Sequence, residues 1–374
     1  MKIFNSGQYI SQGTYKSFQP SLINRQWEVP DMEVLSLLSQ ADQEIGRLDM
    51  FSNYIPNVDL FIRMHVAKEA TSSSRIEGTQ TNIDQVVSDA LSIPPKNKDD
   101  WDEVQNYIKA LKWSIDELKN IPLSSRLIRG AHEILLQGVR GDKKDPGSFR
   151  RSQNWIGGAT LKDASFIPPG HSNIPNLMSD LEKFIHNQEI AMPELLKIAL
   201  IHYQFETIHP FLDGNGRMGR LLIPLYLVNK GVIKMPVLYL SDFFEKNRIL
   251  YFDNLMAARV NSNIIRWIKF FLVGIIETAQ SGINTFDKIL KIKNKTDVKI
   301  STLGTRASKA AKVMDQLYEH PVTDAGKVAA WAGISMPSAY KLIGELESRQ
   351  ILCEITGDQR NRVFVFEDYL ALFR

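Results

Sequence analysis

Apolar residues recur at the spacing of amphipathic helices along most of this chain. Several of the periodic segments begin at an Asp or Ser, whose side chain can cap the free amides of a first helical turn. A chain patterned in this way is expected to fold as a mainly α protein. The spacing predicts helices over residues 31–50, 59–75, 99–118, 124–137, 174–186, 193–208, 215–229, 241–259 and 264–286.

One stretch interrupts the helical pattern. Residues 151–169 include the run QNWIGGATLKDASFIPP, which is rich in β-forming residues, glycine and proline. This composition predicts a short β-hairpin followed by a proline-stiffened loop.

Composition narrows the class of protein. The 374 residues are 44% hydrophobic and 23% charged, which is typical of globular chains of two or three domains. Cys353 is the only cysteine, so an intrachain disulfide and a cysteine-rich metal site are excluded. The first residues lack a signal-peptide pattern, and the most apolar stretch, 264–276, is shorter than the ~20 residues that cross a bilayer. We therefore expect a cytoplasmic protein without membrane contact.

Charge is distributed unevenly along the chain. Residues 288–312 contain eight Lys or Arg and one acidic residue, and the whole net charge of +3 belongs to residues 287–374. This shift predicts a boundary near Phe286. We expect an N-terminal helical region over 1–98, a core over 99–286, and a linker with a small domain over 287–374.

The C-terminal region has its own pattern. Residues 323–352 predict two helices with a turn at Gly333, and residues 353–366 alternate around Gly357-Asp358 as a two-stranded wing would. The whole resembles a winged helix. Its second helix carries two glutamates and one lysine, a modest surface for DNA. DNA contact, protein docking and formation of a homodimer all remain open for this domain.

The segment with the clearest chemistry is HPFLDGNGRMGR, residues 209–220. It follows a strongly apolar helix and opens another, so Gly214, Asn215 and Gly216 lie where free backbone amides and the helix dipole favour an anion. Arg217 and Arg220 are three residues apart on one side of the first turn, and two guanidiniums there suit more than one phosphate group.

Two further side chains complete the chemistry. Asp213 supplies a carboxylate beside the phosphate-binding residues, and Mg²⁺ takes one or two carboxylates together with phosphate oxygens and water. His209 supplies an imidazole that can act as a general base at neutral pH.

The same twelve residues resemble the signature HxFx(D/E)GNGRxxR of the Fic (filamentation induced by cAMP) family of AMP-transferases, with every specified position matched. The likeness extends over residues 31–286 and includes QNWIGG and FIPP. It implies a Fic helical core with a short β-hairpin flap. It also implies a protein adenylyltransferase that uses ATP and Mg²⁺ and modifies a Ser, Thr or Tyr hydroxyl of a target protein or of itself.

The resemblance also implies roles for individual residues. His209 would deprotonate the target hydroxyl, which attacks the α-phosphate of ATP, while Asp213 would hold Mg²⁺. Phe211 is expected to lie in the core and fix the loop. The nucleotide would be held by the segment Gly214, Asn215, Gly216, Arg217, Met218, Gly219 and Arg220.

The resemblance also implies functions for three other segments. SSRIEG at 73–78 resembles the family's inhibitory pattern (S/T)xxxE(G/N), with Ser73 and Glu77 on one helix face; Glu77 would pair with Arg220 and intrude on the γ-phosphate site. Residues 239–247 resemble the segment that lines the adenine pocket, with Asn247 and Tyr239 as the candidate contacts. Residues 154–166 resemble the flap that aligns a target peptide by main-chain pairing.

Alternatives remain at this point. The chain could be a DNA-binding regulator with a latent or sensing Fic core, or a hydrolase that removes AMP from a modified target. His202, Glu206 and His209 invite a zinc interpretation, but HxxxExxH is not the HExxH spacing of zinc proteases. Packing and a local hydrogen bond are the favoured roles for His202 and Glu206.

Overall fold

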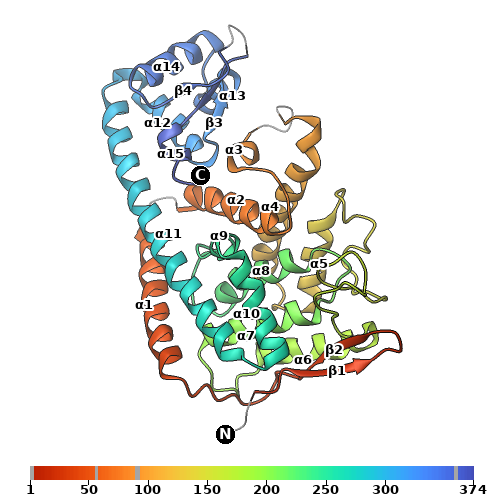
Figure 1. Cartoon of the computed structure of the whole chain (residues 1–374). Helices are drawn as coiled ribbons and strands as arrows, with labels where there is room; N and C mark the ends of the chain where they lie inside the picture. The colour runs from red at the N-terminus through yellow and green to blue at the C-terminus, as the bar shows by residue number, and fades with distance from the viewer. Residues whose placement is uncertain (1–3, 55–57, 89–92, 358–360) are drawn as a thin grey trace.

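A computed structural model describes residues 4–54, 58–88, 93–357 and 361–374. The fold is mainly α, as expected, and consists of a helical core and a smaller C-terminal domain joined by one long helix, α11 (Figure 1). Within the described ranges, no helix has the length and apolarity needed to cross a bilayer.

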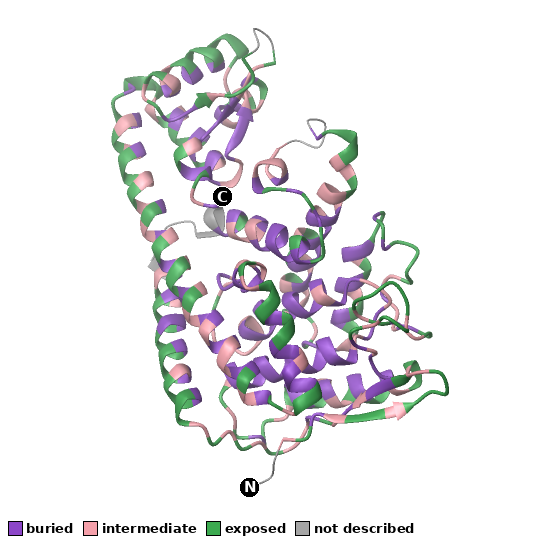
Figure 2. Ribbon diagram, in the orientation of Figure 1, coloured by how far each residue is buried: buried purple, intermediate pink, exposed green. Residues whose placement is uncertain are grey.

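The centre of the core is α7 (Glu194–Ile208), whose residues after Glu194 are all buried. Helix α8 (Asn215–Asn229) packs against it and is almost as fully enclosed, as Figure 2 shows. A helix that is apolar on every side can only be stable inside such a shell. The shell includes α4 (Lys98–Glu117), α5 (Ser125–Leu136), α6 (Ile174–His186) and α10 (Arg248–Asn261).

The N-terminal helices lie against this core. Helix α1 (Met32–Tyr54) packs along α11, and α2 (Val58–Ile76) packs against α4, α8 and the short α9 (Ser241–Lys246). A further turn of helix, α3 (Ile83–Val86), follows α2. The single helix expected over 241–259 is divided at Asn247 into α9 and α10.

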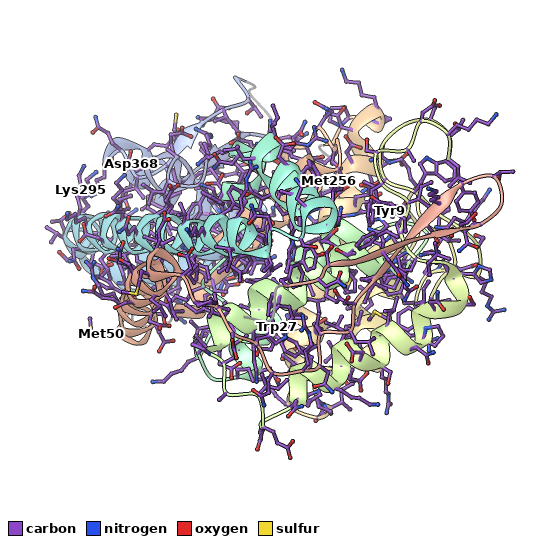
Figure 3. All side chains as sticks on the ribbon, turned by 60° about the horizontal axis from the view of Figure 1, so that its bottom comes forward. Tyr9, Trp27, Met50, Met256, Lys295 and Asp368 are labelled. Carbon is purple, nitrogen blue, oxygen red and sulfur yellow. The ribbon has the colours of Figure 1, made fainter. Side chains whose placement is uncertain are left out.

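The chain opens with a hairpin that the sequence analysis missed. Strands β1 (Gly7–Ser11) and β2 (Lys16–Pro20) pair antiparallel, and each is too short and polar to show a clear alternation. The hairpin lies beside the flap segment, because the Phe18 amide donates a hydrogen bond of 2.8 Å to the Ile167 carbonyl. In Figure 3, Tyr9 marks this hairpin, far from Lys295 and Asp368 at the C-terminal end.

The flap itself is less regular than expected. Over residues 154–166 a single antiparallel bridge joins Ile156 to Phe166, and no pair of strands forms. Gly157 and Gly158 adopt positive φ angles of 70° and 72°, so they turn the chain before a ladder can extend. The short hairpin expected here is thus held by one antiparallel bridge, and the rest of the flap is an irregular loop.

The connection to the C-terminal domain is helical. Helix α11 runs from Ile264 to Ser301 without a break, so it does not end near Phe286 as the charge shift suggested. Two i,i+4 ion pairs lie on this part of the helix, Lys291 with Asp287 and Lys293 with Asp297, both at 2.6 Å. The linker expected after Phe286 is therefore helical as far as Ser301.

The C-terminal domain contains the two helices and two strands expected from the sequence. A third strand, β3, was not expected, and the sheet has the antiparallel order β3-β5-β4. Asp358, at the expected tip of the wing, lies outside the described residues. The elements are α12 (Ala307–Glu319), β3 (Val322–Asp324), α13 (Ala325–Ala332), α14 (Met336–Ser348), β4 (Cys353–Glu354), β5 (Val363–Val365) and α15 (Glu367–Leu370).

Candidate active site

His209 lies at the point where α7 ends. It adopts the left-handed conformation (φ 50°, ψ 61°), which is uncommon for a residue other than glycine and turns the chain out of the helix. Its carbonyl accepts hydrogen bonds from Arg150 Nε (2.9 Å) and Asn154 Nδ2 (3.3 Å) at the base of the flap. The flap and the loop that begins at His209 are therefore held together.

The loop after His209 is closed by Asn215. The side chain of Asn215 accepts a hydrogen bond from the Phe211 amide (2.8 Å) and donates one to the Phe211 carbonyl (2.9 Å). Phe211 is fully buried and stacks on the ring of His132, with centroids 3.7 Å apart. Phe211 thus lies in the core as expected, and Asn215 shapes the loop with its side chain.

His132 holds the same loop from α5, a role that its isolated position in the sequence does not reveal. Its Nδ1 accepts a hydrogen bond from the Gly147 amide (2.9 Å), so we assign the ring proton to Nε2, which then donates to the Asp213 carbonyl (2.9 Å). Burial lowers the pKa of His132 to about 4. The neutral tautomer is therefore stable at neutral pH.

An anion-binding nest forms where α8 begins. Gly214 has a positive φ of 74° at the N-cap, and the first amides of the helix have no partner within it. A Cβ atom placed on Gly216 would lie 2.2 Å from Glu77 Oε1. The Glu77 carboxylate therefore rests directly against the backbone where a phosphate would approach.

Asp213 and Arg217 flank this nest. The Asp213 side chain is 43% exposed, and its Oδ1 accepts the Gly214 amide at 2.6 Å. Arg217 is almost fully buried, where its Nη1 lies 3.3 Å from Glu103 Oε2 and its Nη2 lies 3.8 Å from Asp213 Oδ1. Glu103 lies on α4 outside any motif, so its contact with Arg217 could not be predicted from the sequence.

Arg220 joins the first helices to the nest. Its Nε donates to Ser73 Oγ and its Nη2 to the Ser73 carbonyl, both at 2.9 Å, while Nη2 also donates to Glu77 Oε1 at 2.6 Å. Desolvation works against ionisation of Glu77, but the charge and hydrogen bond of Arg220, with Arg217 beyond, hold the pKa of Glu77 below its usual value. Glu77 is therefore an anion at neutral pH. The structure brings Ser73, Glu77 and Arg220 together.

The electrostatic setting of His209 differs from that of a surface histidine. Burial, together with the positive charges of Arg259 and Arg150, lowers the pKa of His209 to about 3. The imidazole is neutral at neutral pH and can accept a proton.

The zinc interpretation has no support in the geometry. His202 contacts the Gly219 carbonyl through Nδ1 (2.9 Å) and the Tyr251 hydroxyl through Nε2 (2.8 Å), so both ring nitrogens are engaged. A Cβ on Gly219 would lie 2.1 Å from Glu206 Oε1, which places Glu206 against α8. Among the residues the structure describes, no group of three or more His, Cys, Asp or Glu side chains is arranged to hold a metal ion.

Two residues of the signature lie away from the nest. Met218 is fully buried in the hydrophobic core, and its amide donates to the Gly214 carbonyl within the helix. Gly219 faces Glu206 on the inner side of α8. Met218 and Gly219 are thus packed inside the protein, and their contact with a nucleotide stays a prediction.

Tyr239 and Asn247 line one cavity together with Lys246 and Asp242. The Tyr239 side chain is 7% exposed and its hydroxyl has no hydrogen-bond partner among the described residues, while burial raises the pKa of Tyr239 well above its usual value. An unpaired buried hydroxyl is costly unless a ligand meets it. Asn247 Nδ2 donates to the Phe243 carbonyl at 3.0 Å.

The buried histidines predict loss of stability in acid. His132 and His202 have folded pKa values of about 4 and about 3, below the ~6.5 of an unfolded histidine, so stability is complete above pH 6.5 and falls as the pH drops toward the folded values. At pH 5 each ring is expected to cost about 2 kcal/mol. Urea unfolding of His202→Gln between pH 7.5 and pH 5 should show a correspondingly smaller fall than wild type. The control is His171→Gln, because His171 is exposed and its replacement should leave the pH dependence as in wild type. If His202→Gln loses as much stability between pH 7.5 and pH 5 as wild type, then protonation of His202 does not contribute to the acid instability.

Comparison with known proteins supports these observations. A model described as Fic/DOC family N-terminal matches residues 35–116, and one described as Fic/DOC family matches residues 122–227. The chain is 29% identical to "Protein adenylyltransferase Fic" of Drosophila erecta over 205 residues, which cover 47% of this chain and 40% of that protein. It is 25% identical over 247 residues to a probable protein adenylyltransferase of Aquifex aeolicus, covering 64% of this chain and 72% of the relative.

Solved structures share the fold. A Fic family protein from Desulfovibrio desulfuricans superposes with a TM-score of 0.58 at 18% identity, covering 91% of this chain and 98% of its own. Fic-1 from C. elegans gives a TM-score of 0.53 at 18% identity, covering 70% and 74%. With the signature loop, the nest and both domain matches in place, the chain belongs to the Fic/DOC family.

Proposed function

We propose that the protein is an ATP-dependent protein adenylyltransferase, which transfers AMP to a hydroxyl of a target protein or of itself. The observation that carries this proposal is the anion nest at the start of α8, with Arg217 and Arg220 in the first turns of that helix and His209 at the start of the loop that leads into it. The curated relatives named adenylyltransferases support the activity, although this chain spans about 40% of the Drosophila relative's length.

The proposed reaction uses the site as follows. His209 accepts the proton of the target hydroxyl, whose oxygen then forms a bond to the α-phosphorus of ATP. The bond from that phosphorus to the bridging oxygen breaks, and pyrophosphate leaves with the electron pair. The first amides of α8, at Asn215 and Gly216, donate to the charge that develops on the phosphate oxygens. Arg217 and Arg220 hold the outer phosphates.

Asp213 is the residue that would hold Mg²⁺. Its carboxylate is partly exposed beside the nest, and one of its oxygens is engaged by the Gly214 amide, which leaves the other for a cation. A single carboxylate fits an ion that completes its shell with phosphate oxygens and water. When bound, Mg²⁺ would neutralise phosphate charge.

Autoinhibition by Glu77 is part of the proposal. The Glu77 carboxylate lies against Gly216 and occupies the Arg220 guanidinium. A γ-phosphate would need the same guanidinium and the same backbone, so it competes with Glu77. Ser73 strengthens the arrangement because it engages two further donors of Arg220.

The adenine ring is proposed to bind near Tyr239 and Asn247. The unpaired Tyr239 hydroxyl and the Asn247 amide line one cavity, and both can hydrogen bond a purine edge.

The C-terminal domain has the element order of a winged helix, and α14 exposes Tyr340.

Labelled ATP distinguishes this reaction from its alternatives. We expect protein incubated with Mg²⁺ and ATP to retain label from the α-phosphate and none from the γ-phosphate, because pyrophosphate leaves. The Glu77→Gly variant is the one to use, since its label accumulates. Retention of γ-label would indicate phosphate transfer instead, and absence of both labels would contradict an AMP-transferase. In a second step, wild-type protein is added to Glu77→Gly protein that already carries the α-label. Release of that label by the wild type would indicate that it hydrolyses the bond to AMP.

A further inference from the structure

The C-terminal segment packs against α2, the helix that ends at Ile76, directly before Glu77. Phe373 is only 2% exposed, and its ring meets the ring of His65 edge-on with centroids 5.1 Å apart. His65 also packs on Phe286 of α11, at 4.8 Å. Figure 1 shows the C terminus directly beside α2.

The last residue makes a second connection. Arg374 donates two hydrogen bonds to Asp84 Oδ1 of α3, one from Nη2 (2.7 Å) and one from Nε (3.0 Å). It also donates to Glu367 of α15, from Nη2 to Oε2 (3.1 Å) and from Nη1 to the other carboxylate oxygen. Because α3 follows α2 after a short turn, this guanidinium joins the inhibitory region to the C-terminal domain.

A third contact lies at the other end of α2. Arg63 Nη1 lies 3.5 Å from Glu319 Oε2 and donates to His320 Nε2 at 3.0 Å, where α12 packs against α2. The C-terminal domain therefore contacts α2 on its N-terminal half and contacts α3 beyond its C-terminal end. Ser73 and Glu77 lie between these contacts.

We propose that the C-terminal segment 369–374 is a brace that positions the inhibitory helix, with Phe373 and Arg374 as positioning residues for Glu77. The proposal rests on the proposed role of Glu77. His65 and Ile76, the last residue of α2, are eleven residues apart, about 16 Å along a helix of 1.5 Å rise. Glu77 follows directly, between an α2 held on its N-terminal half and an α3 held by Arg374, and these two contacts keep its carboxylate in the nest.

Release of the brace would therefore shift the equilibrium toward a state in which Glu77 has left Arg220. Contacts made only in the inhibited state favour that state by their own free energy, and their loss reduces the free-energy difference between the inhibited and the active state by the same amount. Displacement of the C-terminal domain is thus a route by which the enzyme could be switched on. Asn247 and Phe373 line the same cavity, which ties the brace to the proposed adenine pocket.

The main test uses Arg374→Glu, which places a third carboxylate beside Asp84 and Glu367. Arg374 lines no part of that cavity and is 40% exposed, so this change should leave folding intact. We expect labelling to rise about fivefold or more in the otherwise wild-type chain, and by less than about twofold in the Glu77→Gly background. Adding Asp84→Arg should restore the low rate, whereas a merely structural defect would lower labelling in both backgrounds. Lys341→Glu, with the same charge change on exposed α14, is the matched control.

Amide hydrogen exchange provides a readout that needs no activity. In Arg374→Glu and in Phe373→Ala, exchange over residues 62–77 should become faster, while α7 stays as protected as in wild type. If exchange over 62–77 is unchanged, the brace is overturned whether or not the protein labels. A third outcome separates the brace from its regulatory role. If Glu77→Gly labels, exchange over 62–77 becomes faster in Arg374→Glu, and yet Arg374→Glu labels no more than wild type, then the C-terminal segment holds the helix but does not regulate the enzyme. If Glu77→Gly itself does not label, the proposed function fails and exchange alone decides on the brace.

Discussion

Replacing Glu77 by glycine should raise the rate of AMP labelling by about 5- to 150-fold, the range of a coupling free energy of about 1–3 kcal/mol. The carboxylate lies against Gly216 and takes a donor of Arg220 at 2.6 Å, so its removal frees both for the γ-phosphate. Initial rates with α-labelled ATP and Mg²⁺, measured for wild type and Glu77→Gly, give the ratio directly.

The matched control is Glu245→Gln. Glu245 is also an acid close to α2, and it pairs with Arg75 at 3.6 Å rather than with Arg220. Its replacement should leave the rate within about twofold of wild type, as expected for a surface ion pair of small energy. Equal activation by both variants would mean that loosening α2 in general, and not the Glu77 carboxylate, controls the rate.

Replacing His209 by alanine should lower the labelling rate by a factor of about 10² to 10⁴ in the Glu77→Gly background, which is the usual contribution of a general base. The imidazole is neutral and begins the loop that leads to the nest, whereas alanine offers no acceptor for the hydroxyl proton. Binding of ATP should change little, because the nest and both arginines remain. Rate and ATP affinity measured on the same preparations separate the two effects.

His171→Ala serves as the control for this change. His171 is exposed in a short 3₁₀ turn and has no part in the site, so its loss should leave labelling unchanged. If labelling survives His209→Ala at the Glu77→Gly level, another group must take the proton. If ATP affinity collapses together with the rate, His209 acts in binding rather than as the base.

The helical core and the signature loop could be predicted from the sequence because their signals are local. Helix periodicity placed α6 and α7 within one residue of their observed bounds, and HPFLDGNGRMGR fixed both the loop and the start of α8. Glu77 and Arg220 lie 143 positions apart, and only the family pattern at 73–78 linked them.

Other parts of the site depend on contacts that no local pattern encodes. Glu103 holds Arg217, and His132 holds the carbonyl of Asp213, yet each stands alone in its own helix. The continuous α11 was missed because basic residues were interpreted as a linker, although they also suit an exposed helix face. The contact of Phe373 with His65 could not be predicted, because Phe373 belongs to no helical or strand pattern of apolar residues.

The central claim is that this site transfers AMP and that Glu77 holds it back. Intact-mass spectrometry after incubation with Mg²⁺ and ATP tests it most directly, with wild type, Glu77→Gly, and Glu77→Gly combined with His209→Ala side by side. We expect little adduct on wild type, the mass of AMP on Glu77→Gly, and no adduct on the double variant. An unmodified Glu77→Gly protein, or an adduct with the mass of a phosphate group, would contradict it.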